Sequence, residues 1–201
     1  MESTRPAGKR GRPRAFDAEK ALDRALRVFW KSGYEGATLP ALTRAMGINR
    51  PSLYAAFGNK EALFHKALDR YVEKSGALLR EALALPTARA TVERLFNGIV
   101  NSAASGKVRG CLLVQGALAC GESANPIREE LALRRAETEK AFRERFARAV
   151  REGDLPSDSS PAALAKFVAT FQYGMAVQLA GGAGRKELQA AVDIALRAWP
   201  S

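Results

Sequence analysis

The chain has 201 residues, which is enough for one domain or for one domain and a smaller second one. Lys and Arg outnumber Asp and Glu by 32 to 21, and the net charge of +11 favours a polyanionic partner, either nucleic acid or an anionic membrane face. One histidine and two cysteines exclude a His/Cys-rich zinc site and a disulfide scaffold. The first six residues contain no apolar segment typical of a secretory signal, so we expect a cytoplasmic protein.

The positive charge is concentrated at the start of the chain. Residues 1–60 hold 12 Lys and Arg against 5 Asp and Glu, whereas the longer remainder holds 20 against 16. Within residues 1–14, two prolines and two glycines stand among five basic residues, and Glu2 is acidic. Such a segment cannot bury enough apolar surface to fold by itself, so we predict a disordered basic arm over residues 1–14.

The spacing of apolar residues is helical through nearly the whole chain, which predicts an all-α protein of about nine helices. The first helix begins after Asp17 and ends at Gly33, since a short polar side chain caps a helix start and a glycine ends it. Two short helices follow, and then a long fourth helix that reaches Ala82. The starts of these three helices are capped by Thr38, Asn49 and Asn59.

Pro86 interrupts the pattern, and five further helices are predicted beyond it, over about 92–100, 111–119, 125–150, 161–180 and 188–199. The segment 161–180 contains one charged residue, Lys166, and is apolar on almost all sides. Its polar residues argue against a membrane span. A helix that is apolar on all sides is buried on all sides, so we expect a second protomer to cover this one.

The stretch 38–57 is the most informative for function, because its two short helices are joined by the turn Gly47-Ile48-Asn49. This is the layout of a helix-turn-helix, whose second helix enters the major groove of DNA with its N-terminal residues against base edges. Arg50 can donate two hydrogen bonds to O6 and N7 of guanine. Thr38 can bind a phosphate at a helix start, and Lys60 adds a cation. The residues of the second helix that we predict to contact DNA are Arg50, Pro51, Ser52 and Tyr54.

Residue types at fixed offsets over about 15–65 resemble the DNA-binding signature of TetR/AcrR-type regulators. The matching positions are Gly33-Tyr34, Thr38, Gly47, Leu53-Tyr54, Phe57 and 59–63. The resemblance implies a DNA-binding domain over 15–62 and a helical domain over 63–201 that binds a small inducer and dimerises through its last two helices. It implies a repressor that leaves a palindromic operator when the inducer binds. By the same resemblance, the DNA contacts fall on Thr38, Leu39, Arg50, Ser52, Tyr54 and Lys60.

The chain departs from that signature directly after Tyr54. Ala55 and Ala56 stand where many members place an aromatic residue or histidine. Two polar base readers are thereby removed, so direct readout is expected to depend on Arg50.

The arm carries a second, shorter resemblance. Arg10-Gly11-Arg12-Pro13 matches the core of an AT-hook, an extended strip that lays arginines into a narrow A·T minor groove. Other DNA-binding motifs of this kind carry minor-groove arms, so we predict such contacts for Arg10, Arg12 and Arg14.

Helical phase and the family resemblance together predict the ligand and dimer contacts of the second domain. Inner faces of the later helices are expected to line an apolar pocket for a small hydrophobic or aromatic inducer. Outer faces of the last two helices are expected to form a homodimer. The predicted ligand-binding residues are Phe96, Ile99, Gln115, Phe142, Phe146, Phe171, Gln172 and Gln178, and the predicted dimer contacts are Phe167, Met175, Leu188, Val192 and Trp199.

The remaining motifs have simpler interpretations. Cys111 and Cys120 are about 13.5 Å apart along one helix, which is too far for a disulfide. Cys111 is either a small buried residue or a thiol with a lowered pKa. The glycine-rich segment 181–186 lacks the preceding strand and the spacing of a phosphate loop. With no set of catalytic side chains or metal ligands in the pattern, we expect no enzyme activity, no cofactor and no metal.

Two alternatives to a ligand-responsive repressor remain open. An architectural protein without a ligand switch would use the arm to prefer A·T-rich DNA, and a helical interaction module would not bind DNA. A repressor keeps a large sequence preference at physiological salt and an architectural protein does not, so binding experiments separate them.

Overall fold

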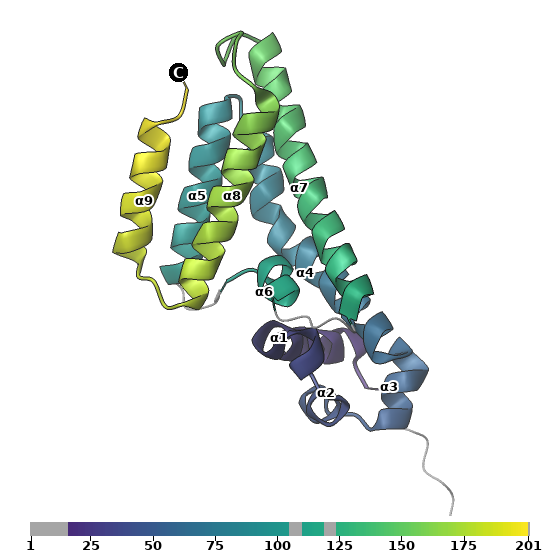
Figure 1. The fold of residues 1–201 in the computed structure, drawn as a ribbon. Coiled ribbons are helices and arrows are strands. Elements are labelled where there is room, and N and C mark those ends of the chain that lie inside the picture. Colours follow the sequence, from purple (N-terminus) through teal and green to yellow (C-terminus); the bar gives the residue numbers. More distant parts are fainter. Residues whose placement is uncertain (1–15, 105–109, 119–123, 201) are drawn as a thin grey trace, which may run out of the picture.

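The computed structural model describes residues 16–104, 110–118 and 124–200. Within these ranges the chain forms nine helices and no strand, which confirms the predicted all-α fold (Figure 1). None of the helices in the described ranges combines the length and hydropathy that crossing a membrane requires. The helices are α1 (Ala18–Gly36), α2 (Leu39–Met46), α3 (Arg50–Phe57), α4 (Lys60–Leu83), α5 (Ala88–Ala104), α6 (Leu112–Leu118), α7 (Asn125–Arg151), α8 (Pro161–Ala180) and α9 (Arg185–Arg197).

The first three helices and the start of α4 share one apolar core. Phe29 of α1 is fully buried and meets the ring of Phe64 edge-on, with ring centroids 5.1 Å apart, an arrangement that aromatic pairs favour. Leu42 of α2 and Leu53 of α3 are buried in the same cluster. Each short helix therefore turns one apolar face inward and leaves its other face to solvent.

Gly33 ends the regular part of α1, as the sequence predicts, although the helical segment continues to Gly36. Its φ of 67° lies in the left-handed region, which residues with a Cβ rarely adopt. The chain turns there and reaches Thr38, which caps α2.

The long helix α4 links the two halves of the molecule (Figure 1). Its apolar residues between Leu63 and Tyr71 belong to the core shared with α1, α2 and α3, whereas Ala82 is buried in a second core with the later helices. The predicted boundary after residue 62 falls inside this continuous helix. The continuous helix α4 therefore contributes to both cores.

Ion pairs fasten α1 to α4. The Nε of Arg70 donates to Oδ1 of Asp23 at 2.9 Å, and the Nζ of Lys74 lies 2.5 Å from the same oxygen. Arg70 also pairs with Glu19. The hydrogen bonds from Arg70 and Lys74 lower the pKa of Asp23 to about 2. At neutral pH, Asp23 is therefore ionised and holds α1 to α4 through these ion pairs.

We expect Asp23→Asn to lower the free energy of unfolding at neutral pH and to lower it much less in acid. A carboxylate with a depressed pKa in the folded state stabilises the fold above its unfolded pKa, near 3.8, and this contribution is lost as the pH falls through about 2. Urea unfolding of both proteins at about pH 7 and about pH 2 measures the effect. Asp158→Asn, in the exposed loop after α7, is the control. An equal difference at both pH values would contradict the ion-pair role.

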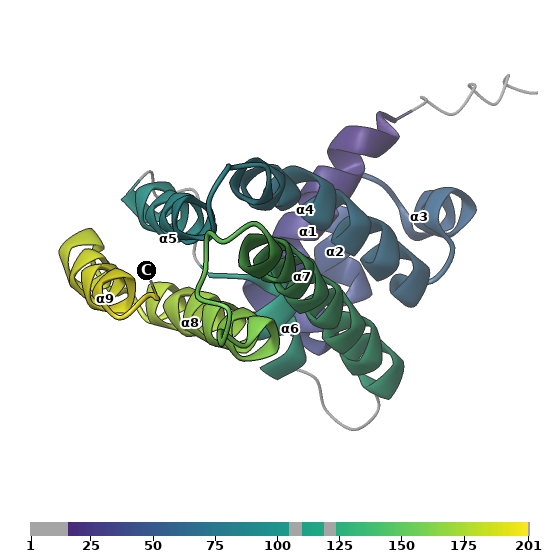
Figure 2. The ribbon, with the colours of Figure 1, turned by 90° about the horizontal axis from the view of Figure 1, so that it is seen from above.

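The second core joins α5, α7, α8, α9 and the end of α4. Phe96, Phe142 and Phe146 are fully buried in it. Figure 2 shows α8 and α9 next to each other at one side of the molecule, with α5 beside α9 and α7 beside α8. The last helix packs on α5, where Nε2 of Gln189 donates to Oδ1 of Asn97 at 3.1 Å.

Four of the five residues predicted for the dimer contact are buried inside the chain itself. The apolar stripe of α9 that suggested an interface is the face that attaches α9 to its own α5, and Met175 of α8 likewise points into the core. Phe167 reaches the surface and is 40% exposed. The four buried residues are Met175 (3% exposed), Leu188 (4%), Val192 (0%) and Trp199 (4%).

Other apolar residues occupy the exposed side of α8 and α9. Val177 is 45% exposed and Ile194 is 60% exposed, high values for large aliphatic side chains. On α8 the exposed positions recur every three or four residues, which makes one helix face. We call this set the exposed stripe, and it consists of Phe167, Thr170, Gly174 and Val177 on α8 with Ala190 and Ile194 on α9.

Candidate DNA-binding surface and ligand cavity

A tight turn joins α2 to α3, as the helix-turn-helix pattern predicts. Gly47 has a φ of 73° and donates its N–H to the carbonyl of Thr43 at 3.0 Å. Oδ1 of Asn49 accepts a hydrogen bond from the N–H of Ser52 at 2.8 Å and so caps α3. Pro51 lies in the first turn of α3, where the N–H groups have no helical partner, and costs no hydrogen bond.

The solvent face of α3 carries the residues predicted to read DNA. Arg50, Pro51 and Tyr54 are exposed, and Ser52 is half-buried. Tyr54 has an exposed fraction of 49%, whereas Leu53 on the opposite face is completely buried. An arginine and a tyrosine on the free face at the start of a helix have the placement that major-groove reading requires. Their contacts with DNA stay a prediction.

Thr38 and Leu39 begin α2 in different surroundings. Thr38 is exposed, and its Oγ1 accepts a hydrogen bond from the N–H of Ala41 at 3.3 Å, which leaves the hydroxyl proton available to a phosphate. Leu39 is half-buried against the first core, so only part of its side chain can reach DNA.

Lys60 interacts with the end of α1. Its Nζ donates to the carbonyl oxygen of Glu35 at 3.3 Å and lies 4.6 Å from the centre of the Tyr34 ring. Burial lowers the pKa of Lys60, and the Glu35 carboxylate partly opposes that shift. The ammonium thus ties the start of α4 to α1, and its contact with a phosphate stays a prediction.

Arg44 is a further basic residue beside the turn, and we did not single it out from the sequence. It is exposed and shares a shallow depression with Asn49 and Arg50. Helical phase was the available signal, because Leu42 and Met46 are buried and Arg44 lies between them on the opposite side of α2.

Arg10, Arg12 and Arg14 of the predicted arm lie outside the described residues, and so does Cys120.

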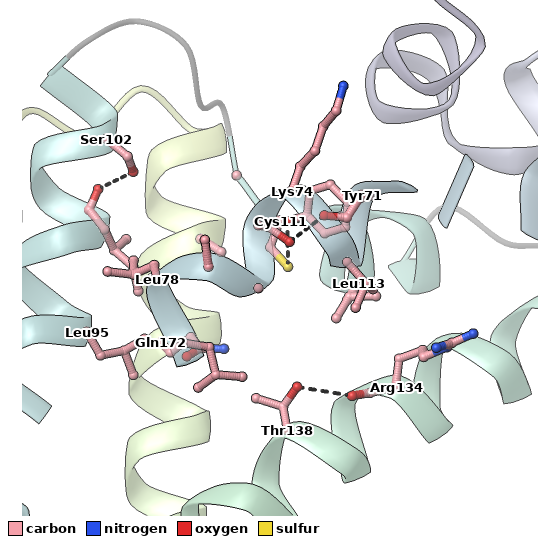
Figure 3. Close-up of a pocket in the computed structure, with 18 of the residues that line it drawn as sticks. Tyr71, Lys74, Leu78, Leu95, Ser102, Cys111, Leu113, Arg134, Thr138 and Gln172 are labelled. Atoms are coloured by element: carbon pink, nitrogen blue, oxygen red, sulfur yellow. Dashed lines mark hydrogen bonds between the residues drawn. The ribbon is translucent and has the colours of Figure 1, made fainter. Parts of the chain in front are cut away.

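A partly open cavity of about 590 Å³ is lined by residues of α1, α4, α5, α6, α7 and α8 and of the segment before α6. Its volume falls within the roughly 300–1,000 Å³ of typical small-molecule sites. Figure 3 shows side chains from several helices surrounding the space. Much of the wall is apolar, including Val72, Leu78, Leu79, Leu95, Leu113 and Leu179.

Two of the predicted ligand-binding residues, Ile99 and Gln172, line this cavity. The other six predicted residues do not line it. Helical phase indicates which face of a helix points inward, but it does not indicate at which level along the helix the core is tightly packed. Phe142 and Phe146 lie in the second core, Phe96 packs on Phe171 with ring centroids 4.7 Å apart, Gln115 lies beside Gly110, and Gln178 is exposed.

Polar groups interrupt the apolar wall at a few points. The Tyr71 hydroxyl donates to Sγ of Cys111 at 3.4 Å (Figure 3). Burial raises the pKa of Tyr71 well above its ordinary value, so the phenol stays protonated and keeps this donor role. Oε1 of Gln172 is buried and accepts no hydrogen bond from the described residues. The wall therefore offers a ligand a mainly apolar surface with few polar anchors.

Comparison with known proteins agrees with this architecture. Residues 21–67 match the family model for bacterial regulatory proteins of the tetR family. The HTH-type transcriptional repressor ComR of Escherichia coli (strain K12) is 32% identical over 197 residues, which cover 95% of this chain and 92% of ComR. The solved structure of a cysteine mutant of the TetR family transcriptional regulator CifR, complexed with 26-bp double-strand operator DNA, is 46% identical, with a TM-score of 0.89 and coverage of 94% of this chain and 100% of that one. By identity over nearly its full length, this chain belongs to the TetR family of DNA-binding transcriptional regulators.

Proposed function

We propose that the protein is a homodimeric repressor that binds a palindromic operator and releases it when a small molecule occupies the cavity. The observation that carries the proposal is the exposed start of α3, with Arg50 and Tyr54, on a fold that is similar to operator-bound CifR with a TM-score of 0.89. Under this proposal it acts in the cytoplasm, where the operator is, and catalyses no reaction.

Base reading is assigned to the first turn of α3. Arg50 is exposed there and can direct two N–H donors at O6 and N7 of one guanine. Tyr54 lies one turn further on the same face and is half exposed. Phosphate contacts are assigned to Thr38 and Arg44, at the two ends of α2, and such contacts set the position of α3 along the groove.

The exposed stripe is assigned to the dimer contact. A twofold axis brings the same surface of both chains together, so a stripe of this kind must be complementary to itself. Small residues such as Gly174 and Thr170 allow close approach of the helices, while Val177 and Ile194 supply apolar area. Two copies of α3 then face successive major grooves about 34 Å apart, which requires a palindromic operator.

Release by a ligand is assigned to the cavity. Its wall includes residues of α4 from Tyr71 to Leu79, and α4 is the helix whose first half packs on α1. A molecule that fits the cavity better when α4 is displaced shifts the population toward a conformer in which the two α3 helices no longer match the grooves.

Selection of bound sequences from a random double-stranded DNA library tests the proposal. At about 150 mM salt we expect one palindromic site bound by two chains, with a specific affinity about 10³-fold or more above that for random DNA. Sedimentation of the complex gives the stoichiometry. If no sequence is enriched at this salt concentration, the repressor proposal fails and the architectural alternative gains support.

The arm is expected to add affinity at the flanks of the operator. Deleting residues 1–14 should weaken binding and remove any preference for A·T base pairs beside the half-sites, because arginines favour a narrow minor groove. Gel-shift titration on operators with A·T or G·C flanks measures both effects, and sedimentation checks that the dimer is kept. Equal affinity of the truncated and complete chains for both operators would refute minor-groove contacts by the arm.

A further inference from the structure

Trp30 connects the cavity to the DNA-binding half of the molecule. It belongs to α1, which packs on α2 of the helix-turn-helix, yet it lines the cavity together with residues of α4, α5, α7 and α8. We propose that the effector rests directly on Trp30 and is a small, uncharged, mainly apolar molecule with a hydrogen-bond donor for Gln172. This inference rests on the proposed function of the cavity as the effector site.

The contacts of Trp30 and of its helix link the cavity to the helix-turn-helix. Its ring meets that of Tyr71 edge-on, with centroids 5.1 Å apart and an interplanar angle of 82°. The same α1 is fastened to α4 through Asp23 and contacts α2, where NH1 of Arg24 donates to the carbonyl of Met46 at 3.4 Å. A ligand that displaces the Trp30 ring therefore displaces the helix on which α2 is seated.

Two buried polar atoms in this wall have no hydrogen-bond partner among the described residues. One is the Nε1 donor of Trp30 and the other is the Oε1 acceptor of Gln172. Buried polar groups in folded proteins are nearly always hydrogen-bonded. Both atoms are closed off from the cavity in this structure, so a ligand satisfies them only when the two side chains turn toward it. A molecule that binds both atoms needs an acceptor for Trp30 and a donor for Gln172, as an alcohol, a phenol or an amide has.

The charged residues of the cavity wall are Lys74, Arg134 and Glu137, and their positions favour an uncharged molecule. Glu137 is exposed, so its carboxylate stays hydrated and offers little to a cation. The Lys74 ammonium is paired with Asp23 on α1, and the Arg134 guanidinium with Asp69 and Glu130. Both side chains lead away from the central space (Figure 3). A carboxylate that enters would lose its hydration without gaining either cation, which is a large cost in an apolar site.

Contact quenching of tryptophan fluorescence tests the proposal on the full-length protein. The probe is 2,2,2-tribromoethanol, an uncharged alcohol whose bromine atoms quench an indole they touch, and tribromoacetate is its anionic counterpart of similar size. Because the chain has two tryptophans, Trp199→Phe leaves the emission of Trp30 alone and Trp30→Phe leaves that of Trp199. Trp199 lies in the second core against Phe146 and does not line the cavity, so it is the matched control.

We expect tribromoethanol to quench Trp30 saturably and Trp199 weakly and without saturation. Gln172→Leu should raise the half-saturation concentration about tenfold, because it removes the acceptor. Tribromoacetate should need a concentration about a hundredfold higher. Retention of the Trp30 emission maximum before the probe is added shows that Gln172→Leu is folded.

Equal quenching of the two tryptophans, or equal potency of the alcohol and the acid, would overturn the inference. Either result can occur in a protein that still binds its operator, so it leaves the DNA-binding proposal standing. Loss of sequence-specific DNA binding by the complete chain would instead defeat the proposed function, whatever the quenching shows.

Discussion

Replacement of Arg50 by alanine is expected to weaken binding to each operator half-site by about 1–3 kcal/mol and to relax the preference at one base pair. The side chain lies exposed at the first position of α3, directly after the Asn49 cap, and Ala55 and Ala56 further along the helix have no polar atoms with which to read bases. Most direct readout by α3 is therefore assigned to one guanidinium. Titration of operator variants that change one base pair at a time measures both effects.

A matched control separates base reading from general attraction to DNA. Arg151→Ala removes the same charge from an exposed position at the end of α7, which is remote from α3 (Figure 1). It should leave the base preference intact and reduce affinity slightly and equally for all sequences. If Arg50→Ala weakens operator and random DNA to the same extent, Arg50 contacts phosphates and does not read a base.

The substitution Ile194→Asp is expected to convert the proposed dimer to monomers and to abolish tight operator binding. Ile194 is 60% exposed in the single chain, and in a symmetric contact each substitution places two carboxylates in the interface. Burial of an unpaired carboxylate is costly enough to raise the dimer dissociation constant by about 100-fold or more. Because both half-sites are then no longer bound together, operator affinity falls by a similar or larger factor. Analytical ultracentrifugation and gel shift measure the two effects.

Leu133→Asp tests whether any exposed aliphatic residue would behave in this way. Leu133 of α7 is 55% exposed and lies outside the exposed stripe. We expect its substitution to leave sedimentation and operator binding unchanged. A monomeric Leu133→Asp protein, or a dimeric Ile194→Asp protein, would place the protomer contact elsewhere on the surface.

The helices and the helix-turn-helix were predictable from the sequence because the signals that create them are local. Asp17, Thr38, Asn49 and Asn59 each cap a helix in the structure as predicted, since a side chain needs to reach only three residues ahead to do so. Gly47 provides the left-handed conformation that the turn requires. The exposure of Arg50 and Tyr54 follows from the helical phase set by Leu53 and Phe57.

The positions of the cavity and of the exposed stripe depend on the tertiary structure. Periodicity indicates correctly that Phe142, Leu188 and Val192 face inward. It does not indicate which helix covers each of them, and in the structure the covering helices belong to the same chain. Trp30 lies far along the chain from the other cavity residues and joins them only because α1 packs beside α4 and the segment before α6. Helix-to-helix packing is a long-range property of the folded chain, so it determines which apolar faces are buried, which remain for a second protomer, and where a space for a ligand is left between them.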